Sequence, residues 1–267
     1  NIQAINFDGY DDVFDDMSGS DGIYRKSLNF NIRIINSFNN IYSTNFDGVD
    51  DYVALGVSGM SAMKNTGTIS AWFKLGTSAT TVDLFRAYAD ANNNVRIMYH
   101  GASNELRAIY KAGGTSEVAF TTDVVENDGL WHHICSTWDS SSANEIKIYL
   151  DGVLKDTTTL TGTFSGSFTL ASIGNSTQSS NYWIGNIDEV SIYNKALTAA
   201  NVTTIYNDGL PYTVAADSGL IGFWRMGDGG IVGNPIATFP TIVDETGNND
   251  GTMTNMTSTD FQADVPE

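Results

Sequence analysis

Apolar and polar residues alternate along much of the chain from residue 68 onward. In the run 68–75 the apolar side chains fall at every second position. The same spacing recurs in three further runs, at 95–99, 106–110 and 146–150. Because successive side chains of a strand point to opposite faces, this period of two predicts strands with one buried face.

Tight turns separate these runs. Residues 100–104 read His-Gly-Ala-Ser-Asn and predict a hairpin loop, and Asp151-Gly152 joins two further apolar runs. Asp-Gly is a strong hairpin signal, because both residues tolerate a positive φ. Many short strands joined in this way predict an all-β fold, in which two antiparallel sheets pack as a β-sandwich jelly roll.

One short helix is predicted after residue 198. Val202, Ile205 and Tyr206 have the spacing of a single helix face. Thr198 can cap the start of the helix, and Gly209 can end it with a positive φ. The jelly roll is therefore expected to end near residue 210.

The chain is expected to have three parts: an acidic N-terminal arm at 1–44, the jelly roll at 45–210 and a C-terminal segment at 211–267. The C-terminal segment contains Phe223 and Trp224, and such aromatic residues argue for docking rather than disorder. It adds a strand either to its own jelly roll, which we favour, or to that of a neighbouring subunit.

Composition narrows the functional classes. The net charge of -18 argues against a nucleic-acid partner, because a phosphate backbone would be repelled. The sequence has no apolar run of the length that spans a bilayer, so membrane insertion is not expected. The acidic residues either serve solubility or supply carboxylates for cations. Cys135 is the single cysteine, which excludes an intrachain disulfide, and we expect it to be a small core residue.

Five short segments follow one another in a characteristic order. They are NFDGVDDYV at 45–53, ISAWF at 69–73, DGLWHH at 128–133, IYLDG at 148–152 and GNIDEVSIYNKALT at 185–198. In this order they resemble the laminin-G-like, concanavalin-A-like jelly-roll family, to which the pentraxins are distantly related. The resemblance implies a domain that binds surfaces and sugars.

The C-terminal segment carries a second, weaker resemblance. It contains WRMGD at 224–228 and GTMTNM at 251–256. These runs are similar to appended segments in virion and fibre proteins of marine bacteriophages. The similarity implies an extracellular or virion-surface location.

A catalytic carboxylate pair is not predicted. A branch of the resembling family hydrolyses β-glucans with two carboxylates on one strand face. Glu126 and Asp128 have a suitable spacing but precede Gly129 in a predicted turn. Asp188 and Glu189 are adjacent, so they are expected to point to opposite faces of a strand. We therefore expect no enzyme activity.

Two histidines follow Trp131 at the start of a predicted strand. His132 and His133 occur without a serine or cysteine nucleophile motif. We expect them to be hydrogen-bonded residues of the core or of its rim.

Calcium is the expected cofactor, if the chain binds one. The oxygen-rich loop with Asp90 and Asn92 resembles the pentraxin loop that supplies an Asp-Asn ligand pair. Alternatively, this loop is only the polar tip of a hairpin and binds no metal. Asp47 and Asp50 belong to a second acidic cluster. Asp188 shares a strand face with core candidates and needs partners, which are either hydrogen-bond donors or a metal.

Two loops have the composition of a sugar site, with aromatic rings for stacking beside amide groups. One loop offers Asn175, Gln178, Asn181, Tyr182 and Trp183. The other loop offers Tyr88, Asn92 and Asn93.

The favoured hypothesis is a non-enzymatic surface-recognition module of a virion fibre or a cell-surface adhesin. It would bind a glycan or cell-surface polysaccharide and form a homo-oligomer or contact other virion subunits. One alternative is a structural capsid or tail decoration protein that mediates subunit contacts. A glycosidase is the second alternative.

Overall fold

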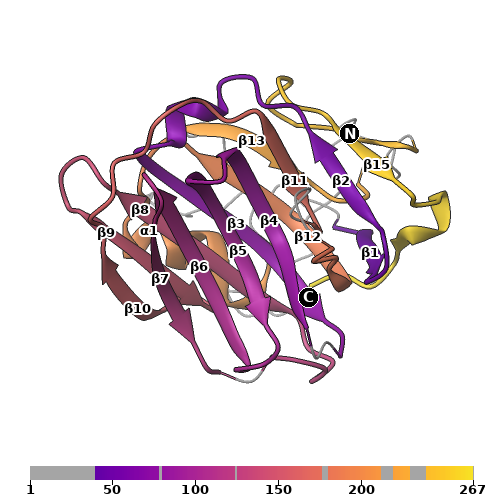
Figure 1. Ribbon diagram of the computed structural model, residues 1–267. Helices are drawn as coiled ribbons and strands as arrows, with labels where there is room; N and C mark the ends of the chain where they lie inside the picture. Colours follow the sequence, from indigo (N-terminus) through magenta and orange to yellow (C-terminus); the bar gives the residue numbers. More distant parts are fainter. Residues whose placement is uncertain are drawn as a thin grey trace, which may run out of the picture. The chain divides into compact units, whose positions relative to one another are not determined.

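The computed structural model describes residues 40–77, 80–123, 125–175, 180–211, 219–228 and 239–266. These residues belong to one compact unit that spans 37–267, and the other unit, 1–36, lies outside the described residues. The described part forms two antiparallel sheets that pack face to face, with one short α-helix (Figure 1). The predicted all-β sandwich of jelly-roll type is thereby confirmed.

The first sheet, called sheet A, has the strand order β10-β9-β8-β3-β12-β1-β16, and β13 also pairs with β12. Its strands are β1 (Ser43–Asp47), β3 (Thr66–Leu75), β8 (His132–Asp139), β9 (Glu145–Leu150), β10 (Val153–Thr159), β12 (Ile184–Tyr193), β13 (Leu220–Trp224) and β16 (Phe261–Gln262).

The second sheet, called sheet B, has the order β14-β15-β2-β11-β4-β5-β6-β7. Its strands are β2 (Tyr52–Leu55), β4 (Thr81–Asp90), β5 (Asn93–His100), β6 (Glu105–Ala112), β7 (Thr115–Thr121), β11 (Leu170–Ile173), β14 (Thr241–Ile242) and β15 (Gly251–Thr254). Asp151 and Gly152 have φ values of 50° and 73°, as expected for the predicted hairpin between β9 and β10.

The main hydrophobic core lies between the two sheets. The alternating residues Ile69, Ala71 and Phe73 of β3 belong to it. The opposite face of β3 is also covered, because Trp72 is buried there and its ring stacks on Tyr206 of α1 (Ala199–Tyr206). A second hydrophobic cluster lies on this outer face of sheet A, and it comprises Cys135, Tyr149, Tyr193, Leu197 and Val202. Cys135 is buried, as predicted.

The predicted helix is present, but it ends earlier than expected. Thr198 caps its start in a reciprocal pair with Asn201. The helix ends at Asn207, which has a left-handed φ of 48°, whereas Gly209 closes the 3-10 turn that follows (Asn207–Gly209). Asparagine can take this conformation because its short polar side chain tolerates it. Short 3-10 helices also occur at Met60–Met63 and Ser258–Asp260.

The C-terminal strands join both sheets of the same chain. β13 pairs with β12 and β16 pairs with β1 in sheet A, whereas β15 pairs with β2 in sheet B. β16 is therefore the C-terminal strand that lies beside β1, which contains Asn45, Phe46 and Asp47. The division of the chain at residues 44 and 210 remains a prediction. No helix in the described ranges has the length and apolarity that a bilayer span requires.

Candidate functional site

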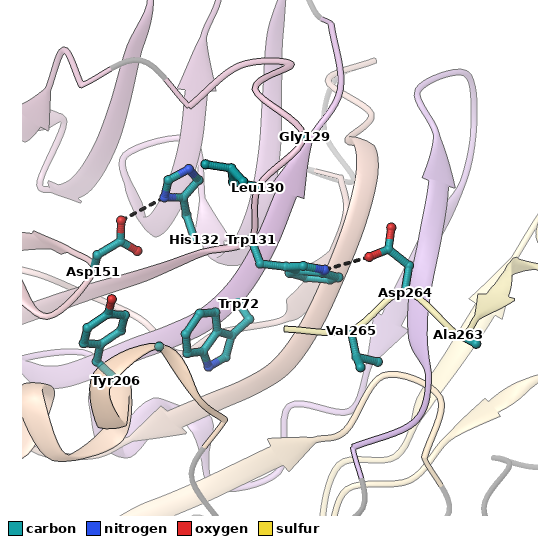
Figure 2. A pocket seen from close by; sticks show the side chains of 11 residues that line it. Trp72, Gly129, Leu130, Trp131, His132, Asp151, Tyr206, Ala263, Asp264 and Val265 are labelled. Atoms are coloured by element: carbon teal, nitrogen blue, oxygen red, sulfur yellow. Dashed lines mark hydrogen bonds and ion pairs between the residues drawn. The ribbon is translucent and has the colours of Figure 1, made fainter. Parts of the chain in front are cut away.

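A pocket of about 570 Å³ opens beside the outer face of sheet A, where β8 begins. Five parts of the chain line it: Trp72 of β3, the entry to β8, Asp151 in the turn after β9, the end of α1 and the residues 263–265 (Figure 2). The side chains that carry its chemistry are Trp72, Trp131, His132, Asp151, Tyr206 and Asp264. Gly129, Leu130, Gly209, Ala263 and Val265 complete the lining.

Aromatic rings form the apolar part of the pocket. The rings of Trp72 and Tyr206 are stacked, with 5.7 Å between centroids and 24° between planes. Trp131 is half-buried and projects across the pocket in Figure 2, where its indole Nε1 donates to Asp264 Oδ1 at 2.9 Å. Such rings provide flat apolar surface beside polar groups, which is the usual composition of a small-ligand site.

His132 is held between two carboxylates. Its Nδ1 lies 2.8 Å from Asp151 Oδ2, and its Nε2 lies 2.8 Å from Asp128 Oδ2. Burial lowers the pKa of His132, but the hydrogen bonds and charges of Asp151 and Asp128 outweigh it and raise the pKa above its ordinary value. Both ring nitrogens are thus engaged by the protein itself.

Asp151 lies in the turn between β9 and β10 and connects this turn to the start of β8. Besides the contact with His132, its Oδ1 accepts a hydrogen bond from the backbone N–H of His133 at 2.8 Å. Burial raises the pKa of Asp151, but these bonds from His132 and His133 outweigh burial and lower it. Asp151 is therefore an ionised acceptor.

Asp264 ties the C-terminal segment to the pocket. Lys74 Nζ lies 2.9 Å from its Oδ2, and Ser43 Oγ donates to its backbone carbonyl at 2.6 Å. The bonds from Lys74 and Trp131 outweigh the effect of burial and lower the pKa of Asp264. Asp264 is thus a second ionised carboxylate, with each oxygen accepting one bond from the protein.

The two loops predicted to bind sugar lie at opposite ends of β4. At the end of the strand, Asp90 Oδ1 accepts bonds from the backbone N–H of Asn92 at 2.7 Å and from Asn93 Nδ2 at 3.0 Å. At its start, Asn181 Nδ2 donates to Asp83 Oδ2 at 3.0 Å. The structure does not bring the two loops together, and neither lines the pocket.

The individual residues of these loops differ in accessibility. Asn93 and Asn175 are buried, whereas Tyr88 and Tyr182 are half-buried. Gln178 lies outside the described residues.

Trp183 does not occupy the position that sugar stacking requires. It is completely buried, and its ring packs edge-on against Phe73, with 5.7 Å between centroids. Its ring presents no face to a ligand, contrary to the stacking role predicted for it. Trp183 is buried because it directly precedes β12 and its side chain packs into the core between the two sheets.

The predicted metal ligands fall at three separate places. Asp47, Asp50 and Asp51 offer ligand atoms within 4.8 Å of one another, the single group of this kind among the described residues. Burial and the charge of Asp47 raise the pKa of Asp51 to about 6, although a backbone bond from Asp47 opposes them. Asp90, beside Asn92, lies at the end of β4, and Asp188 is a buried residue of β12 that pairs with Trp72 of β3.

Asp188 and Glu189 do not point to opposite faces of a strand. β12 contains a register shift between Asp188 and Ser191, and Glu189 has a φ of 47°, which interrupts the alternation of the strand. Both carboxyl groups are buried, and they lie close enough together for the charge of Glu189 to raise the pKa of Asp188. Asp188 Oδ2 accepts a bond from Asn40 Nδ2 at 2.8 Å. The expectation of opposite faces was wrong because a β-bulge breaks the alternation.

Arg225 is the cation of this buried group. Its Nε lies 3.2 Å from Glu189 Oε1 and its Nη2 lies 2.9 Å from Asp228 Oδ2. Burial raises the pKa of Asp188, of Asp228 and, to about 7, of Glu189, against the attraction of Arg225 for the last two. This group, called the Arg225 cluster, joins β12 to the C-terminal segment.

Sequence reasoning identified the segments of the pocket but not the pocket. Trp131-His132 and the Asp151-Gly152 turn were both recognised as motifs, the first as rim or core and the second as a hairpin. The prediction that His132 is a hydrogen-bonded residue of the core or its rim is confirmed. Nothing in the sequence around Asp264 indicated that it lies near Trp131, because that contact depends on how the C-terminal segment returns to sheet A.

A family model described as the concanavalin A-like lectin/glucanases superfamily matches residues 47–203, which is more than half of the chain. No curated protein sequence matches the chain.

Solved structures with a similar fold come from several organisms. One is a proposed carbohydrate-binding protein from Bacteroides ovatus, with 16% identity, a TM-score of 0.61 and coverage of 85% of this chain and 61% of that one. Another is domain 4 of an extracellular arabinanase from Geobacillus stearothermophilus, solved with arabinotriose, with 23% identity, a TM-score of 0.51 and coverage of 61% and 76%. A heptameric pentraxin from Limulus polyphemus has 15% identity, a TM-score of 0.48 and coverage of 62% and 82%. The chain therefore spans 61% of the length of the Bacteroides protein.

Proposed function

The chain belongs to the concanavalin A-like lectin/glucanases superfamily, and from this premise we propose that it is a non-enzymatic module that binds glycans through the pocket beside sheet A. The observation that carries the proposal is the combination of the half-buried rings of Trp131 and Tyr206 with ionised acceptors in one pocket. Sugars present apolar C–H faces that rings can cover and hydroxyl groups that carboxylates can accept.

The acid–base properties of the pocket support binding rather than hydrolysis. A glycosidase needs one carboxyl group with a raised pKa that can protonate the leaving oxygen. The pKa values of Asp151 and Asp264 are both lowered, and each carboxylate is already committed to two protein donors. An assay for reducing-sugar release tests the glycosidase alternative, and we expect no release.

The biological setting is proposed from the sequence. The runs at 224–228 and 251–256 favour a virion fibre or a cell-surface adhesin that acts as an oligomer outside the cell. Immunogold labelling of particles from the native source tests this setting. Label on soluble protein alone would contradict the virion assignment.

Truncation of Trp131 tests the pocket directly. Binding is first located on an array of oligosaccharides that includes arabinotriose, and affinity is then measured by calorimetry. We expect Trp131→Ala to weaken binding at least about tenfold, because stacking contributes on the order of 1 kcal/mol or more and the Asp264 contact is also lost. Trp131→Phe should lose less, because it keeps a ring.

Phe120→Ala is the matched control. Phe120 is an exposed aromatic residue of β7 and does not line the pocket. Its truncation should leave affinity unchanged. An array on which no glycan binds would refute the proposed function. Equal affinities of wild type and Trp131→Ala would move the site to the loops of Tyr88 or Tyr182.

A further inference from the structure

The polar groups of the pocket have an unequal balance of donors and acceptors. Two ionised carboxylates, Asp151 and Asp264, line it, and a third carboxyl group, that of Asp128, is hydrogen-bonded to His132. Among the lining residues that the structure describes, His132 is the single cationic group, and no lysine or arginine is present. This balance has a consequence for the kind of ligand that the pocket accepts.

The side-chain donors near the carboxylates already serve the protein. His132 uses Nδ1 for Asp151 and Nε2 for Asp128. Trp131 Nε1 donates to Asp264 Oδ1, and the ammonium group of Lys74 pairs with Asp264 Oδ2. An anionic ligand would therefore have to compete with a carboxylate for each of these donors.

The carboxylates, in contrast, keep capacity for a ligand. An ionised carboxylate has about four acceptor positions on its two oxygens. Hydrogen bonds within the protein use two positions on Asp151 and two on Asp264. Hydroxyl and amine groups can supply the donors for the rest, and bonds from them to ionised carboxylates are stronger than bonds between neutral groups.

We propose that this pocket selects glycans that present hydroxyl or amine donors and carry no carboxylate, sulfate or phosphate. The inference rests on the proposed function and names its ligand class. Repulsion supplies the exclusion, because an acidic group within about 4 Å of a carboxylate meets an unfavourable charge that screening only partly removes. The net charge of -18 acts in the same direction at longer range.

Matched glycan pairs test the selectivity. Each pair consists of a neutral oligosaccharide and the same oligosaccharide with an added sialic acid or with a uronic acid in place of a neutral sugar. For the pairs whose neutral member binds, we expect the acidic member to bind at least about tenfold more weakly at low salt. The difference should shrink as the salt concentration rises.

Asp151→Asn removes one charge with little change of shape. Asparagine also tolerates the positive φ of 50° at this turn. The variant should bind acidic members several-fold better relative to their neutral partners than the wild type does. Asp123→Asn is the control, because it removes the same charge from an exposed residue that does not line the pocket, and it should leave the ratio unchanged.

The outcomes separate the two proposals. Binding of acidic members as tight as that of their neutral partners would overturn the selectivity and leave the glycan-binding function standing. An equal change of the ratio in Asp123→Asn and Asp151→Asn would also overturn it, because net charge and not the pocket would then discriminate. Absence of binding by every member would refute the proposed function, and the selectivity with it.

Discussion

At the scale of single residues, carboxylates occur in two contrasting environments. Asp151 and Asp264 are surrounded by donors, which lower their pKa values and keep them charged at neutral pH. Asp188 and Glu189 are enclosed by the core, where burial raises their pKa values. The first environment suits recognition of a ligand, whereas the second makes stability depend on protonation.

The calcium prediction belongs to this scale, at the group Asp47, Asp50 and Asp51. If calcium binds the folded protein there, added calcium should raise the melting temperature progressively, because it stabilises the folded state alone. Asp50→Asn should reduce that increase, and Asp90→Asn should not. Melting curves that coincide in chelator and in millimolar calcium would contradict the prediction.

At the scale of elements, β12 pairs with two different strands, one after the other, along the same edge. Its residues 184–187 pair with β1, and its residues 190–193 pair with β13. The β-bulge at Asp188 and Glu189 lies between these two stretches. The bulge thus lies at the point where β13 replaces β1 as the neighbour of β12. Its two residues, Asp188 and Glu189, belong to the Arg225 cluster.

Deletion of residues 219–267 tests the importance of the C-terminal strands. The truncated protein would expose the edges of β1 and β2 and leave Glu189 without Arg225. We expect a destabilised protein that aggregates during size-exclusion chromatography. A well-folded monomer with an unchanged melting temperature would contradict this expectation.

Thr198→Ala is the control of modest effect. It removes the side chain that caps α1 and should cost about 1 kcal/mol of unfolding free energy without aggregation. Urea denaturation of both variants provides the comparison.

At the scale of the whole molecule, stability should depend on pH through the Arg225 cluster. The pKa of Glu189 is raised to about 7, so the folded state holds its proton more tightly than the unfolded state does. Between about pH 4.5 and 7 the folded state therefore binds more protons, and stability falls as pH rises through this window. Asp188 and Asp228 act in the same direction.

Glu189→Gln isolates this contribution, because the amide resembles the protonated acid. The variant and the wild type should be similarly stable near pH 4.5, and above about pH 7 the wild type should be less stable by about 3 kcal/mol. His133, whose pKa burial lowers to about 4, opposes this trend equally in both proteins. Chemical denaturation across the pH range measures the difference, and parallel stability curves would contradict the assignment.

Features that depend on residues close in sequence could be predicted, whereas features that depend on contacts between distant segments could not. The alternation in β3, the Asp151-Gly152 hairpin and the cap at Thr198 are local features, and the sequence predicted all three. The bulge at Glu189 was missed because it coincides with a change of partner strand along β12, which depends on segments distant in sequence. The pocket was missed because Asp264 reaches Trp131 only through tertiary structure.

The entry of the last strands into both sheets has a consequence for biosynthesis. Because β15 and β16 follow the other strands that the structure describes, a nascent chain on the ribosome carries unpaired edges on β1 and β2 until residues 251–262 emerge. Pairing between segments so distant in sequence is slow, and open edges can meet those of other chains. Production of this protein should therefore depend on chaperones that shield strand edges during translation.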